Sequence, residues 1–352
     1  MALSDVPLSL LDRANTRGGS TEAEDLARVV ERAERAEELG YHRFWVAEHH
    51  AVPGIAGSAP AVLMAALAAR TRRLRIGSGG IMLPNHQPLV VAEQAATLEA
   101  LHPGRIDLGV GRSLGFTAAV RDALRTGKEA ADRFGDDLAE LLAHLSGAAP
   151  VTARPRNHAA TPVFVLATGA GVETAARAGL AVVLGGPAIF REGPGGGAAV
   201  LERYRAQFRP SSWWPEPYAV VSANVAVART RAAARELLLP EARALAASRT
   251  RGEFPPLAPA RPAEPDGLTA RERALVQETL TSSVHGTAPE VRDQLERLLA
   301  RTGADELLVT GGAHDLDAQA DSDRRLAALF TTRPARPPPR EGRPGGGGGE
   351  CG

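Results

Sequence analysis

Short apolar runs alternate with longer amphipathic segments along most of this chain of 352 residues. Residues 7–11 form the first run. In residues 21–40, apolar side chains then recur at every third or fourth position, as on one face of a helix. Strands that alternate with helices predict parallel pairing through right-handed crossovers. About eight such units follow one another, which predicts an α/β fold with a single closed (β/α)8 TIM-type barrel rather than an open sheet.

The periodicity also predicts where the elements and domains lie. We expect a barrel over residues 1–332, with a loop insertion near residues 248–285 because residues 250–268 are rich in proline and alanine. Residues 333–352 are rich in proline and glycine without an apolar pattern, so we expect a disordered tail. The predicted strands are residues 7–11, 41–47, 74–83, 105–110, 163–167, 181–184, 218–227 and 306–310. The predicted helices are residues 21–40, 58–69, 89–101, 132–145, 172–178, 200–208, 231–248, 289–301 and 323–330.

The charge balance and the cysteine count exclude several classes of protein. Lysine plus arginine and aspartate plus glutamate both number 41, so nothing indicates a nucleic acid or an anionic membrane as a partner. Cys351 is the only cysteine, which excludes an internal disulfide and a thiolate metal cluster. The N-terminus has no signal-peptide pattern, and no window approaches the roughly 20 apolar residues of a membrane span. We therefore expect a cytoplasmic protein.

Polar residues and glycines follow the predicted strands, which is where a barrel of this type carries its active site. Glycines are needed where backbone approaches a ligand closely, and imidazoles and carboxylates can exchange protons. The candidate site residues at these strand ends are Asp12, Glu48, His49, His50, Gly79, Gly80, His86, Arg112, Thr168, Gly169 and Gly171.

Two of these strand ends could hold an anion. Residues 168–171 open a predicted helix, where free backbone N–H groups can bind a phosphate, and Arg112 could add a bidentate contact. The alternative is that the glycines serve tight strand–helix turns and that Arg112 lies on the surface. The same stretch also half-matches a dinucleotide-binding fingerprint, with Thr174 in place of the third glycine and Glu192 near the spacing of the ribose-binding carboxylate.

The Glu48-His49-His50 sequence has three interpretations. A metal site needs three or four ligands, but strand alternation sends His49 to the opposite side from Glu48 and His50, so no metal is expected. In the second interpretation the imidazoles are simply hydrogen-bonded at the barrel rim. In the third, at least one histidine takes part in proton chemistry or contacts the substrate, because imidazole titrates near neutral pH. Asp12, Glu48, His50 and His86 are candidates for substrate or supporting contacts.

Three longer stretches of the sequence resemble one known family. They read LGYHRFWVAEHH, IGSGGIMLPNHQPLVVAEQAATLEALHPGRIDLGVGR and TGADELLVTGGAHD. Together they resemble the bacterial-luciferase-like flavin-dependent monooxygenases, and most of all an actinobacterial branch found among antibiotic-tailoring enzymes. The resemblance is dense over residues 8–112, looser over residues 161–227 and close again over residues 284–330.

The resemblance implies a usually dimeric TIM-type barrel that binds reduced FMN supplied by a separate flavin reductase. Oxygen would add to the flavin to give a C4a-hydroperoxide, which oxidises a small organic substrate such as an intermediate of secondary metabolism. His49 matches the family's catalytic histidine. Gly79 and Gly80 match a bulge beneath the isoalloxazine ring, and Arg112 and the turn at residues 168–171 match phosphate contacts.

The match also has departures, and two other functions stay open. Residues 167–171 read Ala-Thr-Gly-Ala-Gly where close relatives carry serines, and residues 184–187 read Leu-Gly-Gly-Pro where relatives carry bulkier or polar groups. The first alternative function is hydride transfer with a deazaflavin on the same fold, without oxygen chemistry. The second is a non-catalytic flavin-binding accessory protein in a biosynthetic cluster.

Overall fold

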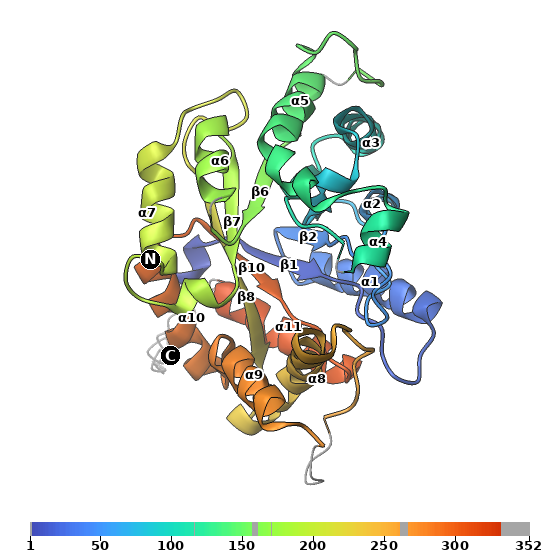
Figure 1. Cartoon of the computed structure of the whole chain (residues 1–352). Helices are drawn as coiled ribbons and strands as arrows, with labels where there is room; N and C mark the ends of the chain where they lie inside the picture. Colours follow the sequence, from blue (N-terminus) through green and yellow to red (C-terminus); the bar gives the residue numbers. More distant parts are fainter. Residues whose placement is uncertain (1, 116, 157–160, 170, 261–266, 332–352) are drawn as a thin grey trace, which may run out of the picture.

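A closed barrel of eight parallel strands forms the centre of the molecule, and helices surround it (Figure 1). The strands follow one another around the barrel in chain order, and β10 closes the ring by pairing with both β1 and β8. The predicted (β/α)8 barrel is confirmed. The barrel strands are β1 (Leu8–Asp12), β2 (Arg43–Val46), β3 (Arg75–Ser78), β5 (Ile106–Gly111), β6 (Val163–Ala167), β7 (Ala181–Gly185), β8 (Ala219–Val227) and β10 (Glu306–Thr310). This computed structural model describes residues 2–115, 117–156, 161–169, 171–260 and 267–331.

The helices lie outside the barrel, and local sequence signals set where several of them begin. Thr21 caps α1 through a capping box, in which its hydroxyl accepts from the Glu24 N–H and the Glu24 carboxylate accepts from the Thr21 N–H. Proline occupies the first turn of α2, α3 and α10, where a missing N–H costs nothing. None of the helices in the described part of the chain has both the length and the apolar character needed to span a bilayer. The helices are α1 (Glu22–Glu38), α2 (Pro60–Arg70), α3 (Pro88–Leu101), α4 (Ala118–Ala123), α5 (Phe134–Ser146), α6 (Gly171–Ala178), α7 (Gly197–Gln207), α8 (Arg231–Arg251), α9 (Ala270–Thr281), α10 (Ala288–Thr302) and α11 (Leu316–Phe330).

Aromatic rings and an ion-pair network fill the N-terminal half of the barrel interior. The Trp45 and Phe164 rings meet edge to face with their centroids 4.9 Å apart. At the strand beginnings, Arg43 donates to Asp107 at 2.7 Å and to Glu306 at 3.1 Å. Because these groups close one end of the barrel, the C-terminal ends of the strands remain as the place for a ligand.

The third predicted strand is not continuous. β3 stops before Gly79-Gly80, whose peptide bond is cis, and a short strand β4 (Ile81–Met82) then pairs with β5. A 3₁₀ turn, η2 (Leu83–Asn85), follows. The apolar pattern of residues 74–83 concealed this break, because glycines interrupt a strand without adding a polar side chain.

The predicted loop insertion near residues 248–285 is wrong for much of that interval. α8 continues to Arg251, and the interval contains the helix α9 and a short strand β9 (Val284–Gly286) that pairs with β8. α9 buries only Val276 and Leu280 as large apolar side chains against α8, so its apolar stripe was too short to stand out beside the proline-rich segment. The predicted tail at residues 333–352 lies outside the described residues, and its disorder stays a prediction.

Candidate active site

A cavity of about 940 Å³ opens at the C-terminal ends of the barrel strands. Cavities that bind small molecules usually measure about 300–1,000 Å³, so this one has room for a cofactor together with a substrate. Asp12, His50 and His86 are not among the residues that line it. The predicted site residues that do line it are Glu48, His49, Gly79, Gly80, Arg112, Thr168, Gly169 and Gly171.

One side of the cavity carries the residues predicted to hold an anion. Arg112 directly follows β5, and Thr168 and Gly169 directly follow the neighbouring strand β6. Gly171 is the first residue of α6, and the N–H groups at a helix start carry a partial positive charge. Arg112 and Thr168 are exposed. This side can therefore hold a phosphate that is partly in contact with solvent.

Gly79 and Gly80 line the cavity where the barrel interior leaves no space for a side chain. A Cβ on Gly79 would lie 2.6 Å from Cδ1 of Leu11. A Cβ on Gly80 would lie 2.9 Å from both the Gly109 carbonyl oxygen and Cδ1 of Leu166. The contact with the Gly109 backbone means that glycine is needed at position 80, whereas a side chain at position 79 would require the Leu11 side chain to shift. The wall here is backbone, which a planar ring can approach closely.

His49 lines the cavity with its pKa lowered to about 4. Burial is the main cause; the positive charge of Arg13 lowers this pKa further, and the carboxylate of Glu48 opposes both effects. The backbone N–H of His49 donates to the Gly57 carbonyl at 2.9 Å, which helps to fix the residue. His49 is therefore neutral at pH 7, with one ring nitrogen able to donate a hydrogen bond and the other able to accept one.

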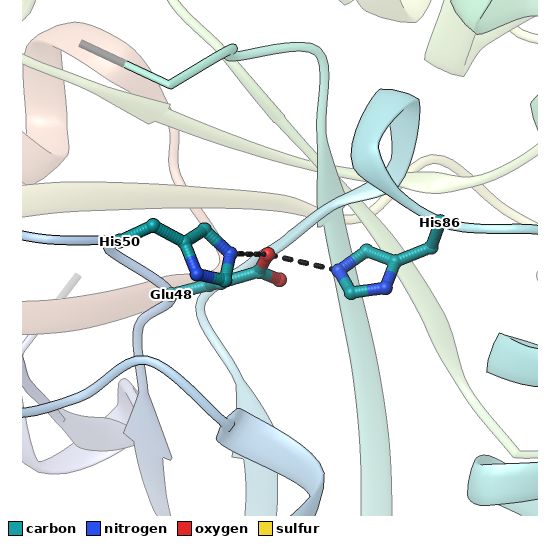
Figure 2. A group of neighbouring side chains, drawn as sticks. All are labelled: Glu48, His50 and His86. Carbon is teal, nitrogen blue, oxygen red and sulfur yellow. Dashed lines mark hydrogen bonds and ion pairs between the residues drawn. The ribbon is translucent and has the colours of Figure 1, made fainter. Parts of the chain in front are cut away.

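Glu48 connects two further histidines at the edge of the cavity (Figure 2). His50 Nε2 lies 2.6 Å and His86 Nε2 lies 2.8 Å from the same carboxylate oxygen, Oε1 of Glu48. The Met82 N–H donates to the other oxygen, Oε2, at 3.0 Å. Burial alone would raise the pKa of Glu48, but the hydrogen bonds from His86, His50 and Met82 hold this pKa below its usual value. Glu48 and His50 are in contact, as predicted, but β2 ends at Val46 and both Glu48 and His49 line the cavity, so these residues do not follow strand alternation. The approach of His86 could not be predicted from the sequence.

Asp12 lies at the end of β1, as predicted, but its carboxylate is occupied elsewhere. It accepts from Arg32 of α1 at 2.9 Å and from the Ala14 N–H at 2.7 Å. Arg32 also donates to Asp323 of α11 at 2.9 and 3.0 Å. Asp12 thus joins β1 to two helices, and the structure gives it a role in packing rather than a place in the cavity.

The sequence reasoning missed one whole wall of the cavity. This wall comes from β1 and β10, which lie across the barrel from β5 and β6, together with β8, α8 and α9. Arg13 is the second residue after the first predicted strand, so its position was a usable signal. Thr279 belongs to the helix that was not predicted, so no signal pointed to it. The wall comprises Arg13, Ser222, Ala223, Asn224, Leu245, Arg249, Thr279, Ser282, Leu308 and Thr310.

Comparison with known sequences agrees with this geometry. A family model described as luciferase-like monooxygenase matches residues 7–306. A protein of Escherichia coli strain K12 named luciferase-like monooxygenase is 38% identical over 323 residues, which cover 90% of this chain and 95% of that protein. The N-acetyl-S-alkylcysteine monooxygenase of Bacillus subtilis is 49% identical over 139 residues, which cover 40% of this chain and 42% of that protein.

Solved structures share the fold over nearly the whole chain. The structure of apo-MsnO8 has a TM-score of 0.79 at 33% identity and covers 94% of this chain and 100% of its own. Two more distant structures show the fold alone. One is the oxygenating constituent of 3,6-diketocamphane monooxygenase from Pseudomonas putida in complex with FMN, with a TM-score of 0.67 at 16% identity over 94% of this chain and 98% of its own. The other is an F420-dependent secondary alcohol dehydrogenase, with a TM-score of 0.68 at 15% identity over 93% of this chain and 100% of its own. On the family match, the full-length relative and this fold, the chain belongs to the luciferase-like monooxygenase family.

Proposed function

We propose that this protein uses reduced FMN and O₂ to oxidise a small organic substrate in the cavity at the strand ends. The observation that carries the proposal is the combination of an anion site and a neutral imidazole in one cavity of about 940 Å³. The anion site consists of Arg112 with Thr168, Gly169 and Gly171, and the imidazole is that of His49. A cavity of this kind suits a cofactor with a phosphate at one end and a reactive ring at the other.

The residues present fit FMN. Arg112, the Thr168 hydroxyl and the backbone around Gly169 and Gly171 would hold the phosphate, because charged and backbone donors both favour an anion. The side-chain-free wall at residues 79–80 would lie against the planar isoalloxazine ring. The sequence of residues 167–171 contains no serine, so the phosphate would rely on one hydroxyl, backbone N–H groups and the guanidinium group.

The chain's own residues would position the reactants and handle one proton. Reduced FMN, when bound, supplies the two electrons that the oxidation of the substrate by O₂ requires. His49 would donate or accept a hydrogen bond, and then a proton, beside the reacting atoms. Burial, with a smaller contribution from the nearby charge of Arg13, lowers the pKa of His49 and keeps it neutral at pH 7. Leu11 and Leu308 line the cavity as nearly buried apolar side chains, which helps to exclude water from the reaction.

The substrate would bind against the wall opposite the anion site. This wall combines an apolar side chain, Leu245, with hydroxyl and amide groups and the guanidinium of Arg249. It suits a small molecule with polar groups. The name of the Bacillus subtilis relative makes N-acetyl-S-alkylcysteines the first substrate class to test, and intermediates of secondary metabolism are the second.

We also propose that a separate flavin reductase supplies the reduced FMN and that the protein acts in the cytoplasm as a homodimer. Residues 168–174 half-match a dinucleotide-binding fingerprint, but they open α6 of a closed barrel rather than a helix of a Rossmann sheet. This placement favours an external source of electrons. Two strongly exposed apolar side chains, Val62 and Leu101, lie on the neighbouring helices α2 and α3, and burial of these side chains against a second copy would be favourable.

Cofactor titration tests the proposal and separates it from its two alternatives. Reduced FMN and reduced F420 are titrated under anaerobic conditions, and O₂ uptake and substrate mass are then followed with a flavin reductase present. We expect FMN binding and a substrate gain of one oxygen atom. Binding of F420 instead would indicate a deazaflavin enzyme, and FMN binding without substrate oxidation across the tested classes would indicate an accessory protein.

The Arg112→Ala variant tests the phosphate contact itself. A charge-assisted hydrogen bond contributes about 1.5–3 kcal/mol, so the affinity for reduced FMN should fall by about tenfold to a hundredfold. Arg177→Ala, at the opposite end of α6 with an exposed side chain, is the matched control and should bind normally. Equal affinity of the two variants would remove Arg112 from the site.

A further inference from the structure

Three potential metal ligands, Glu48, His50 and His86, meet beside the active-site cavity (Figure 2). Their donor atoms, one carboxylate oxygen and one ring nitrogen from each histidine, all lie within 4.8 Å of one another. Among the described residues, no arginine or lysine forms an ion pair with Glu48. Its fully buried negative charge is thus met by two imidazoles and one backbone N–H.

We propose that Glu48, His50 and His86 bind one divalent transition-metal ion, Zn²⁺ or a cation of similar character, with a fourth position open to water. Two imidazoles and one carboxylate are a common set of protein ligands for zinc. None of these three residues is among those proposed to hold FMN or to transfer a proton. The metal site is therefore an additional property of the protein and does not depend on the proposed function.

The observed distances require only a small adjustment to accept the ion. Zinc bonds of about 2.0–2.1 Å in a tetrahedron place donor atoms about 3.3 Å apart, whereas the two imidazole nitrogens now lie 2.6 and 2.8 Å from the carboxylate oxygen. The His50 ring therefore has to move away from the oxygen by about 0.7 Å and the His86 ring by about 0.5 Å. The side chains of His50 and His86 are 20% and 28% exposed, so they can move and they leave a path from solvent to the buried carboxylate.

The protonation of the triad also permits metal binding. Without metal, each imidazole can donate its Nε2–H to Glu48, so that two hydrogens point at one oxygen. With metal, each ring carries its hydrogen on Nδ1, and Nε2 binds the ion through its lone pair. One divalent cation then takes the place of two shared hydrogens and supplies the positive charge that the carboxylate lacks.

Backbone contacts hold the ligands ready for an ion. The Met82 N–H donates to Glu48 Oε2 at 3.0 Å and thereby orients the carboxylate, leaving Oε1 for the ion. The backbone N–H of His86 donates to the Leu83 carbonyl at 3.0 Å. Because the ligands come from the end of β2 and from the segment after β4, a bound ion would join these two segments and stabilise the folded protein.

A zinc titration of the flavin-free protein tests the site. All proteins carry Cys351→Ser, so that this thiol does not bind the ion, and they are treated with EDTA before Zn²⁺ is added in competition with a chromophoric chelator. We expect one Zn²⁺ per chain with a micromolar dissociation constant. Loss of a supporting group alone typically weakens metal binding 10–100-fold, so His86→Gln, which loses a ligand, should weaken it at least tenfold. The control variant His314→Gln should bind normally.

Two further measurements keep the result interpretable. Zn²⁺ should raise the melting temperature of the Cys351→Ser protein, and this rise should disappear in His86→Gln. His50→Gln serves as the second ligand variant if circular dichroism shows that His86→Gln is unfolded. The proposal is refuted if the Cys351→Ser protein binds less than one Zn²⁺, or if the ligand variants bind as tightly as His314→Gln. FMN is absent throughout, so neither outcome bears on the proposed oxidation reaction.

Discussion

Replacing His49 with glutamine should remove a pH-dependent instability from the folded protein. The usual pKa of histidine, 6.5, applies to the unfolded chain, whereas His49 in the folded protein has a pKa of about 4. Between these two pH values the unfolded chain binds a proton that folded His49 does not bind. The wild-type free energy of unfolding therefore falls as the pH falls from 6.5 toward 4, and above pH 6.5 the contribution is close to zero because His49 is neutral in both states.

The size of this effect follows from the two pKa values. The complete shift corresponds to about 3 kcal/mol. At pH 5, where the unfolded histidine is almost fully protonated and the folded one is about 10% protonated, the cost is about 2 kcal/mol. Glutamine retains a polar amide in the cavity but does not titrate. The variant should therefore lose about 2 kcal/mol less stability than the wild type between pH 7.5 and pH 5.

Urea unfolding of the flavin-free proteins at these two pH values measures the difference. Titrating groups distant from His49 act equally in wild type and variant, so they cancel in the comparison. His314→Gln, which lies outside the cavity, is the control. Its free energy of unfolding should change between the two pH values by the same amount as that of the wild type. If the free energy of unfolding of His49→Gln and of the wild type falls by the same amount between the two pH values, His49 is not desolvated in the folded protein.

His49→Gln should also bind reduced FMN, yet its rate of substrate oxidation should fall by about 10²–10⁴-fold. Turnover near the wild-type rate, with normal coupling of O₂ use to substrate oxidation, would show that His49 has no role in proton transfer.

Three other changes test the barrel and the assembly. Arg43→Met should lower the free energy of unfolding by about 3–5 kcal/mol, because Asp107 then keeps only Arg75 as a cationic partner and the buried carboxylate of Glu306 loses the arginine that pairs with it; urea unfolding measures this. Gly109→Ala places a Cβ 2.1 Å from the Ser78 carbonyl oxygen and should cost about 3 kcal/mol, with weaker FMN binding in a fluorescence titration. If the homodimer forms through α2 and α3, Val62→Asp should yield monomers in size-exclusion chromatography with light scattering.

Each of these variants has a matched control. Arg70→Met breaks an exposed ion pair on α2 and should cost less than about 1 kcal/mol. Gly135→Ala in α5 meets nothing within 4 Å and should not destabilise the protein. Val151→Asp changes another exposed valine, one that does not belong to α2 or α3, and should leave the assembly intact. If a control variant changes the stability or the assembly as much as the test variant with which it is matched, the structural reason given for that test variant is contradicted.

Local pattern was enough to predict the barrel. The eight apolar runs and the helices between them are properties of contiguous residues, and parallel pairing with right-handed crossovers leaves few ways to arrange them. The same reasoning placed candidate site residues at the strand ends, and His49, Gly79, Gly80 and Arg112 do line the cavity there; their functional roles stay predictions. α9 was missed because only Val276 and Leu280 place large apolar groups on its buried side. Two apolar positions next to a proline-rich region are too few to indicate a helical periodicity.

Contacts between distant parts of the chain were decided by the tertiary structure alone. His86 contacts Glu48, which is 38 positions away in the sequence, and Glu241 of α8 pairs with Arg13, which is 228 positions away. No periodicity in the sequence predicts either contact. The same holds for the pKa of His49, since it depends on how much water the folded barrel removes from the imidazole and on the position of a guanidinium group from another strand. The sequence by itself determined which groups stand at the strand ends. Their charge states and partners follow from burial and from distances through space, which exist only once the barrel has closed.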